Sequence, residues 1–463
     1  MLIKETGYGI IADEVLRAAV RKGEAARMFK RFSLWLMLLS ALAVNARAAT
    51  LCVNAPGVVA LTDSRGAEII ENGRFESVFA VREGELYAAG RRGAYRLYDA
   101  QGELVSAVVF SMIDDTGEAL RYRSEGLYGA MSASGEILLQ SRWTRLVPDG
   151  KGGWLALESD PLDEQPDEIV HIDPSGSENP TGVYCTDGLG AMVGGRMPFV
   201  DADGRYGVLD ADGAIAVNPA WQYIGPYSNG FAKVASQEGL GIIDGSGRAV
   251  IPPSYRWLER SDAMIVGWDG TNVDLYGPRA SQRRARLMGK AQELALVGDC
   301  LVVRYEARTC LYDANGRLLG QNEGAVEYAA GTRGQLIASN GTWGDRCQWL
   351  VNPDGSRASG MFQQLLPLCA ERYAFLEMPG ETYQSEALGR SETVWNYKEC
   401  RYGLVDSRGR ILIPARYREI RVLSSDRLLL IGDDRVQIAD RNGVVMKTWI
   451  TPAGAESSRE AAE

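Results

Sequence analysis

The chain has 463 residues, of which 46% are apolar and 24% charged, and its formal net charge at pH 7 is −10. An acidic exterior disfavours nucleic acid as a partner. The seven cysteines are too few for a disulfide framework in so long a chain, and none has the Cys-x-x-Cys spacing of a zinc site. We therefore expect no nucleic-acid partner, no metal and no cofactor.

The N-terminus predicts export. Residues 28–48 have the pattern of a secretory signal peptide, with a basic start, an apolar stretch at 32–44 and a small-residue cleavage site at 46–48. The apolar stretch is short for a bilayer, although an uncleaved N-terminal membrane anchor is the alternative. Because Met28 opens the pattern, we interpret residues 1–27 as an upstream mis-start. The mature chain is then secreted or extracytoplasmic, without a transmembrane segment.

From residue 49 to 450 one turn signal recurs, Asp-x-x-Gly between two short apolar runs. The turn glycines from Gly66 to Gly247 are 36, 33, 41, 37 and 34 residues apart, and a fixed period of this size indicates stacked supersecondary units. Asp can hydrogen-bond the backbone two residues on, and Gly tolerates a left-handed backbone. These structural turn residues include Asp63, Gly66, Asp99, Gly102, Asp210, Gly213, Asp244, Gly247, Asp313, Gly316, Asp406, Gly409, Asp440 and Gly443.

The apolar runs around each turn predict a β-hairpin, and another apolar strand follows it. Each unit of about 35 residues thus offers three or four short strands, which a meander joins most simply. In five units an aromatic residue stands eight positions after the turn glycine, which predicts a repeated packing anchor. A sugar-stacking surface is the alternative for these residues. They are Phe110, Trp143, Trp221, Tyr255 and Tyr417.

We count eleven units between residues 49 and 450. Closing such an array into a ring leaves only short, protected strand edges. We therefore predict an all-β, propeller-like fold of one or two rings, with an open solenoid-like array as the alternative. Residues 270–292 are the candidate division between two rings, and residues 451–463 read as a disordered tail.

Several stretches share a more specific pattern. They are Tyr206-Gly-Val-Leu-Asp210, Gly230-Phe-Ala-Lys-Val234, Gly241-Ile-Ile-Asp244, Ile251-Pro-Pro-Ser-Tyr255 and Tyr402-Gly-Leu-Val-Asp406. This pattern resembles the WG-repeat (KWG-repeat) family of bacterial proteins, with Tyr206 and Tyr402 standing where the family's name expects Trp. The resemblance implies β-rich tandem repeats, often exported, with no established chemistry and no catalytic residues to carry over.

Candidate chemical residues are few. The single histidine, His171, reads as an ordinary strand residue. Cys300 and Cys310 flank a predicted hairpin and are a candidate disulfide, with two buried free thiols as the alternative. Residues 379–397 interrupt the repeat and hold three aromatic residues. Because binding residues favour loops on a rigid scaffold, this segment is a candidate binding loop, although a solvated loop is the plainer interpretation. Its aromatic residues are Tyr383, Trp395 and Tyr397.

These observations favour an exported repeat scaffold or binding module for a protein or a cell-envelope glycan, without catalysis. A propeller-type glycan-active enzyme that uses a carboxylate pair is the alternative. Acidic residues are so frequent that pairs arise by chance, and the repeated aspartates already have a role in turns, so we place no catalytic pair. A purely structural spacer is the third hypothesis.

Overall fold

The computed structural model describes residues 50–158, 165–186, 189–280, 282–341, 347–369, 371–385 and 390–451. The fold below is that of the second of two units of the chain, residues 51–463. The expected upstream segment and signal peptide, and the tail beyond Thr451, lie outside the described residues. Within the described ranges, no helix has both the length and the apolar composition needed to cross a membrane.

In its described residues, the second unit contains short strands and one 3-10 helix, η1 (Tyr397–Glu399). In the first half, the strands are β1 (Leu51–Ala55), β2 (Val58–Thr62), β3 (Glu68–Ile70), β4 (Ser77–Arg82), β5 (Leu86–Arg91), β6 (Ala94–Asp99), β7 (Leu104–Phe110), β8 (Met112–Asp115), β9 (Leu120–Ser124), β10 (Leu127–Met131), β11 (Ile137–Trp143), β12 (Arg145–Pro148), β13 (Trp154–Leu157), β14 (Asp167–Ile172), β15 (Glu178–Cys185), β16 (Met197–Val200), β17 (Tyr206–Leu209), β18 (Ile215–Trp221), β19 (Tyr223–Ile224), β20 (Phe231–Ser236), β21 (Gly239–Asp244) and β22 (Ala249–Tyr255).

In the second half, the strands are β23 (Trp257–Arg260), β24 (Ile265–Trp268), β25 (Val273–Tyr276), β26 (Arg283–Leu287), β27 (Glu293–Val297), β28 (Cys300–Arg304), β29 (Arg308–Tyr312), β30 (Leu318–Glu323), β31 (Glu327–Ala330), β32 (Leu336–Asn340), β33 (Cys347–Val351), β34 (Gln364–Pro367), β35 (Arg372–Glu377), β36 (Gly380–Ser385), β37 (Arg390–Trp395), β38 (Arg401–Asp406), β39 (Ile411–Tyr417), β40 (Glu419–Ser424), β41 (Arg427–Ile431), β42 (Arg435–Asp440) and β43 (Val445–Ile450).

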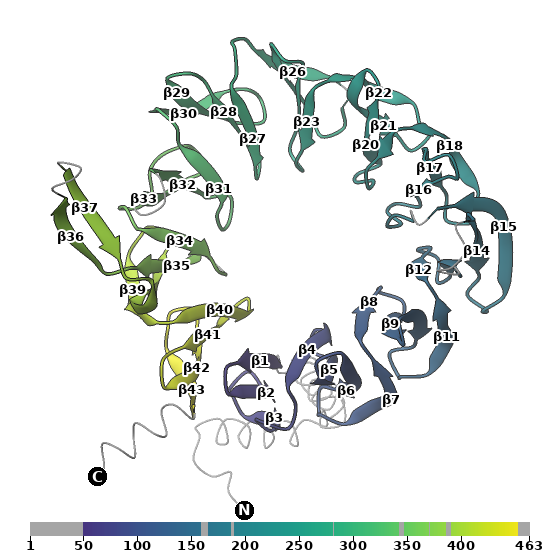
Figure 1. Ribbon diagram of the computed structural model, residues 1–463, viewed down its shortest axis with the longest axis horizontal. Helices are drawn as coiled ribbons and strands as arrows, with labels where there is room; N and C mark the ends of the chain where they lie inside the picture. Colours follow the sequence, from purple (N-terminus) through teal and green to yellow (C-terminus); the bar gives the residue numbers. More distant parts are fainter. Residues whose placement is uncertain are drawn as a thin grey trace, which may run out of the picture. The chain divides into compact units, whose positions relative to one another are not determined.

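These strands form eleven small antiparallel sheets, which we call blades 1 to 11 in chain order, and one separate hairpin, β36–β37. The blades comprise β1–β3, β4–β7, β8–β11, β12–β15, β16–β18, β19–β22, β23–β26, β27–β30, β31–β33, the set β34, β35, β38 and β39, and β40–β43. In Figure 1 the blades follow one another around one ring. The predicted all-β, propeller-like fold is therefore confirmed, and residues 270–292 contribute β25 and β26 to blade 7.

The position of a strand within its blade explains its sequence. In a four-stranded blade the first strand lies nearest the centre of the ring and the last at its outer rim (Figure 1). Second strands such as β5 and β13 are almost continuously buried, because neighbouring blades cover both of their faces. Outermost strands such as β22 and β39 alternate between buried and exposed residues. Proline in these strands, as at Pro252 and Pro414, lacks the N–H needed to extend a sheet and so protects the rim.

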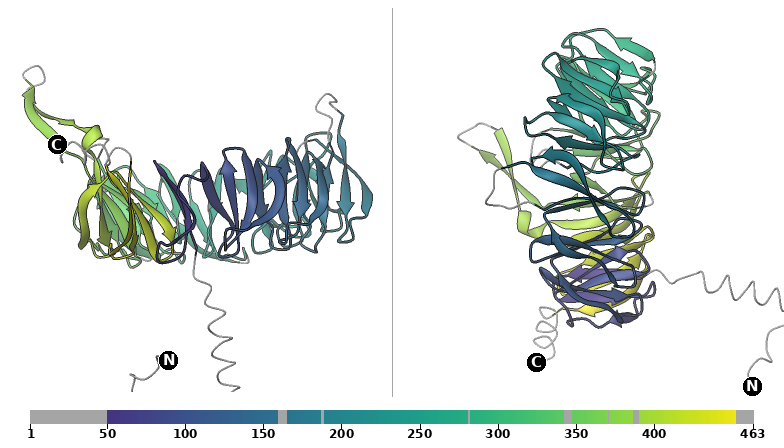
Figure 2. Two further views of the ribbon diagram at one scale, coloured as in Figure 1. Left: turned by 90° about the horizontal axis from the view of Figure 1, so that it is seen from below. Right: turned by 90° about the vertical axis from the view of Figure 1, so that its right-hand side faces the viewer.

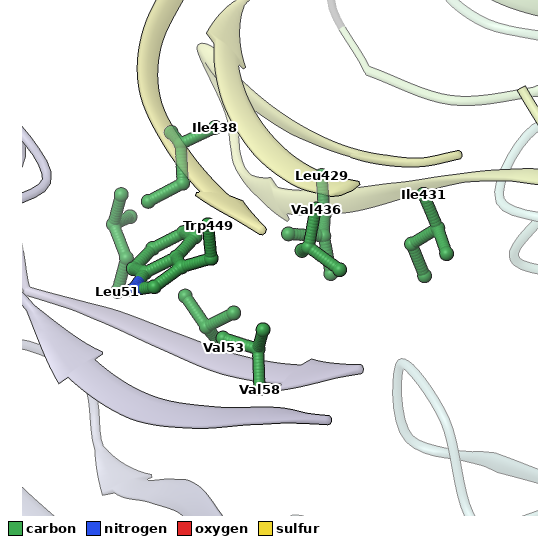
Figure 3. Close-up of a cluster of buried hydrophobic side chains, with 8 residues drawn as sticks. All are labelled: Leu51, Val53, Val58, Leu429, Ile431, Val436, Ile438 and Trp449. Carbon is green, nitrogen blue, oxygen red and sulfur yellow. The ribbon is translucent and has the colours of Figure 1, made fainter. Parts of the chain in front are cut away.

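The ring closes where blade 11 meets blade 1, and the two blades share no strand. Figure 3 shows the buried cluster at this joint, in which Leu51, Val53 and Val58 of blade 1 face Trp449 and four aliphatic residues of blade 11. The indole Nε1 of Trp449 also donates to Oε1 of Glu68 over 2.6 Å. Closure therefore depends on side-chain packing and not on a strand contributed by both ends of the chain.

The turn glycines have a second role that the sequence did not reveal. A Cβ placed on Gly247 would lie 2.8 Å from Cγ1 of Val217 in the outermost strand of the preceding blade, and one on Gly443 would lie 2.3 Å from Cδ1 of Ile413. At the ring closure, a Cβ on Gly66 would lie 2.6 Å from Cβ of Lys447. Both the left-handed backbone and this close approach to the preceding blade therefore require glycine.

The predicted disulfide between Cys300 and Cys310 is wrong, because both cysteines are free. In the β28–β29 hairpin, Cys310 lies opposite Val303 and not opposite Cys300. Side chains that lie directly opposite share one face of a sheet, and successive residues alternate between faces. Cys300 is three residues from Val303, so its side chain points to the other face. The alternative of two buried thiols holds.

Candidate functional site

The predicted turn residues form one recurrent structure. At Asp210, the side-chain Oδ1 accepts hydrogen bonds from the backbone N–H of Asp212 and Ala214 over 3.0 and 2.9 Å, and the Gly213 N–H donates to the Asp210 carbonyl. The same arrangement occurs at the other predicted turn aspartates. Each turn joins the last two strands of its blade, so all lie on one face of the ring, which we call the turn face. These aspartates hold backbone in place.

The predicted aromatic anchors all end the outermost strand of a blade. Phe110, Trp143, Tyr255 and Tyr417 are buried, whereas Trp221 is half-buried. Each lies opposite the first residue of the repeat's apolar run in the neighbouring strand, as Tyr417 lies opposite Tyr402. The four buried rings offer no open face on which a sugar could stack.

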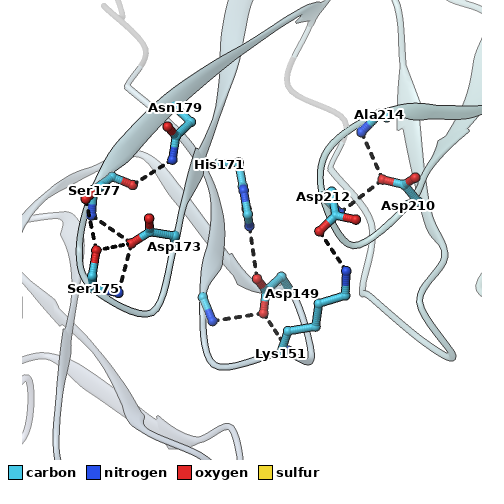
Figure 4. Close-up of polar contacts among 11 residues, drawn as sticks. Asp149, Lys151, His171, Asp173, Ser175, Ser177, Asn179, Asp210, Asp212 and Ala214 are labelled. Atoms are coloured by element: carbon cyan, nitrogen blue, oxygen red, sulfur yellow. Dashed lines mark hydrogen bonds and ion pairs between the residues drawn. The ribbon is translucent and has the colours of Figure 1, made fainter.

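The single histidine belongs to a polar cluster on the turn face (Figure 4). Nε2 of His171 lies 3.1 Å from Oδ2 of the buried Asp149, whose Oδ1 accepts from the backbone N–H of Lys151 and Gly153. Among the described residues, His171 forms no hydrogen bond to a serine, threonine or cysteine, so no nucleophile completes a triad there. The cluster instead links β14 to the turn between β12 and β13.

The same cluster extends to the next blade. Nζ of Lys151 lies 2.6 Å from Oδ1 of Asp212, in the turn of blade 5. The hydrogen bond from this ammonium group holds the pKa of Asp212 below its usual value. Both side chains are exposed, so water screens the pair and it adds little to the stability of the fold. Sequence reasoning missed this contact because its partners are 61 residues apart.

The interruption at 379–397 lies within blade 10. Strands β36 and β37 form a separate hairpin between β35 and β38, and the hairpin stands away from the blades (Figures 1 and 2). Glu377 at the end of β35 lies opposite Arg401 at the start of β38, so the hairpin leaves from the face opposite the turn face. Tyr383 lies in β36, Trp395 ends β37 and Tyr397 begins η1. The predicted loop is thus mainly a β-hairpin, and these three side chains lie outside what the structure describes.

The base of this hairpin is held by one amide side chain and by a backbone hydrogen bond. The side chain of Gln363 accepts from the Met378 N–H over 2.5 Å and donates to the Met378 carbonyl over 3.2 Å. The N–H of Asn396 donates to the Pro379 carbonyl over 2.8 Å. These contacts and the neighbouring strands β35 and β38 hold both ends of the hairpin. They fix the base of the hairpin relative to blade 10.

A pocket of 670 Å³ lies beside this base, and we call it the hairpin-base pocket. Its lining is largely apolar, with Phe362 and Phe375 in contact at 5.5 Å between ring centres, and with Met361 55% exposed. Glu377, Glu399 and Arg401 supply charge at its edge. An exposed apolar hollow with a charged rim is suited to binding. Within the described ranges, no three histidine, cysteine or acidic side chains are grouped to hold a metal ion.

Comparison with known proteins identifies the repeat. A family model described as "WG containing repeat" matches residues 206–237 and 402–429. Two stretches of the chain thus match a WG repeat. Each matched stretch starts on the second-to-last strand of a blade and continues into the next blade, since Tyr206 lies in β17 and Tyr402 in β38. A WG repeat in this chain therefore spans a joint between blades and not a single blade.

Solved structures give weaker likenesses. The chain is 8% identical to one titled "Crystal structure of the eukaryotic initiation factor", over 87% of this chain and 96% of that one, with a TM-score of 0.41. BamB from Moraxella catarrhalis is 16% identical, over 58% and 92% (TM-score 0.27), and Kluyveromyces lactis Hsv2p is 10% identical, over 57% and 99% (TM-score 0.29). These scores are too low to support an argument. No curated protein matches the sequence significantly.

Proposed function

We propose that this WG-repeat chain is an exported scaffold that binds a polypeptide partner at the hairpin-base pocket and performs no catalysis. The observation that carries the proposal is that the interruption of the repeat coincides with an exposed apolar pocket. Met361 and Ile411 line this pocket and are exposed to solvent. The packing of the blade does not need exposed apolar side chains at a hollow, so their exposure favours a binding role. The repeats supply a rigid support, and a binding surface on such a support loses little conformational freedom when a partner docks.

A polypeptide fits this pocket better than a glycan does. The aromatic anchors that might have stacked on sugars are mostly buried, whereas methionine and aliphatic side chains line the pocket and suit apolar side chains of a partner. Export is supported by the N-terminal sequence pattern, which predicts a partner in the cell envelope or outside the cell.

The test uses residues 49–463 as bait in an envelope extract. Met361→Asp should remove a partner that the wild type retains, because a carboxylate in an apolar contact is costly to desolvate. Met288→Asp, at a methionine that directly follows β26 and is 74% exposed, is the matched control and should retain the partner. Equal retention by both variants, or a ligand identified only on a glycan array, would contradict the proposal.

A further inference from the structure

A second pocket lies on the same face, where blade 10 meets blade 11. Its volume is 310 Å³, and it lies between the end of β39 and the hairpin that joins β41 to β42. Arg416, Tyr417, Arg435, Gln437 and Val445 line it, together with Gly432, Asp433 and Asp434. This size suits one small chemical group better than a large ligand.

The pocket is lined by two arginines and two aspartates, but both aspartates are paired with arginines other than Arg416. Asp433 pairs with both Arg401 and Arg418, and Asp434 pairs with Arg435. Arg416 forms no ion pair within the part of the chain that the structure describes, and it supplies the unmatched positive charge. Residues 401–450 contain ten Lys and Arg against six Asp and Glu, in a chain of net charge −10. An anionic ligand is therefore favoured here.

Arg416 is also held in place. Its Nη2 donates to Tyr417 Oη over 3.2 Å, and its guanidinium carbon lies 5.1 Å from the centre of the Tyr417 ring. Tyr417 is buried, and its hydroxyl donates to Gln437 Oε1 over 3.0 Å. A guanidinium has five N–H donors, so most of those on Arg416 stay available in a side chain that has already lost much of its freedom. The planar fork matches the paired oxygens of an oxyanion.

The joint of blades 3 and 4 has an arginine at the equivalent position, and that arginine is paired with a carboxylate. Arg142 also precedes the aromatic anchor of its blade, Trp143, and its Nη2 lies 2.5 Å from Oε2 of Glu178. Glu178 stands two residues after the turn glycine of the next blade. The residue two positions after Gly443, in the blade that follows Arg416, is Val445. The chain thus neutralises the arginine at one joint and leaves the equivalent arginine without its carboxylate at the other.

We propose that the pocket around Arg416 is a binding site for an oxyanion, a carboxylate or phosphate group carried by a small ligand. Arg416 provides the charge and the donor fork, Tyr417 and Gln437 keep it in place, and Val445 leaves room where Glu178 fills the equivalent site. This site is separate from the hairpin-base pocket, and it holds whether or not a polypeptide binds there. Because the site is open to solvent, binding should weaken as ionic strength rises.

The test measures binding of inorganic phosphate and of glucuronate to residues 49–463 by titration calorimetry and by the NMR signal of the arginine guanidinium carbons. Val445→Glu supplies the missing carboxylate and should weaken binding at least about tenfold. Val444→Glu makes the same change of charge one residue away, where the side chain is 63% exposed and does not line the pocket. This control should weaken binding less than about threefold, by screened repulsion alone.

Two further variants test the arginine itself. Arg416→Gln should abolish measurable binding, and Arg416→Lys, which keeps the charge but loses the fork, should bind at an intermediate strength. Binding of phosphate alone or of glucuronate alone would support the site and identify whether it takes a phosphate or a carboxylate group. The proposal is overturned if neither probe binds at millimolar concentration, or if the variants at 444 and 445 weaken binding equally. Unchanged circular dichroism and melting temperature establish that each variant is folded.

Discussion

Two joints of the ring solve the same packing problem with different chemistry. The joint of blades 11 and 1 is mainly apolar and has no covalent connection through the chain. The joint of blades 6 and 7 is continuous and has a polar centre, in which Tyr255 of blade 6 donates to the buried Asp274 of blade 7 over 2.9 Å. Arg286 donates twice to the same carboxylate, over 2.6 and 2.7 Å.

The geometry of the two joints is nevertheless shared. In each, the turn of one blade packs against its predecessor, with Gly66 against Lys447 at the closure and Ala280 within the apolar cluster between blades 6 and 7. Ala280 has a φ of 56°, so it adopts the left-handed backbone although it is not glycine. The comparison indicates that a joint requires a turn of the right shape, and that the contacts around it are free to vary.

The largest effect should follow from truncation at the closure. Trp449→Ala removes the largest side chain of the closing cluster, and we expect a loss of about 3–5 kcal/mol in the free energy of unfolding. Trp143→Ala, at the buried anchor of blade 3, should cost a similar amount if the closing joint is as well packed as an interior one. Denaturant unfolding of both variants checks this, and a cost below about 1 kcal/mol at Trp449 would show that the ring is not closed in solution.

The polar joint should respond to pH. Burial by itself raises the pKa of Asp274, but hydrogen bonds from Arg286 and Tyr255 outweigh it, and the pKa lies below its usual value. Asp274→Asn should therefore cost about 2–4 kcal/mol near pH 7.

The sign of the pH dependence follows from the lowered pKa. The wild type's advantage over Asp274→Asn is complete above the carboxyl pKa of the unfolded chain, near 4, and shrinks as pH falls through that value towards the lower pKa of the folded state. Unfolding of both proteins at a series of pH values measures it. An advantage that is constant down to about pH 3 would exclude the buried carboxylate as its source.

Alanine substitutions at two turn glycines should distinguish the cost of backbone strain from the cost of close packing. Gly443 and Gly176 have nearly equal φ angles, 89° and 84°, but a Cβ on Gly176 would meet nothing within 4 Å. Alanine at either position costs about 1–2 kcal/mol of left-handed strain, and at Gly443 the contact with Ile413 should add about 1–3 kcal/mol. Thermal unfolding of the two variants gives the difference, and equal costs would show that the blades can move apart to admit a methyl group.

The smallest effect should come from the hairpin. Replacing residues 380–395 by two glycines leaves the pairing of β35 with β38 in place, so we expect a change within about 0.5 kcal/mol. The melting temperature measures this directly. A cooperative transition at a much lower temperature would mean that the hairpin stabilises blade 10.

Much of the fold could be predicted from local pattern. The spacing of Asp and Gly identifies the turns, because the side-chain oxygen of Asp and the left-handed backbone of Gly act within four residues. The aromatic residue eight positions later marks the end of the outermost strand for the same reason. The candidate sites could not be predicted in this way. Nothing local shows that Gln363 holds Met378 or that Val445 lies beside Arg416, since these contacts join different strands or blades.

The sequence by itself determined the strands, the turns and the number of repeats, because each depends on interactions within one unit of about 35 residues. Only the tertiary structure decided that eleven units close into one ring, because closure depends on the small rotation between neighbouring blades, which accumulates around the ring. It also decided that Cys300 and Cys310 point to opposite faces and that Arg416 forms no ion pair with any residue that the structure describes. Such relations arise where separate segments meet, and no periodic pattern in the chain encodes them.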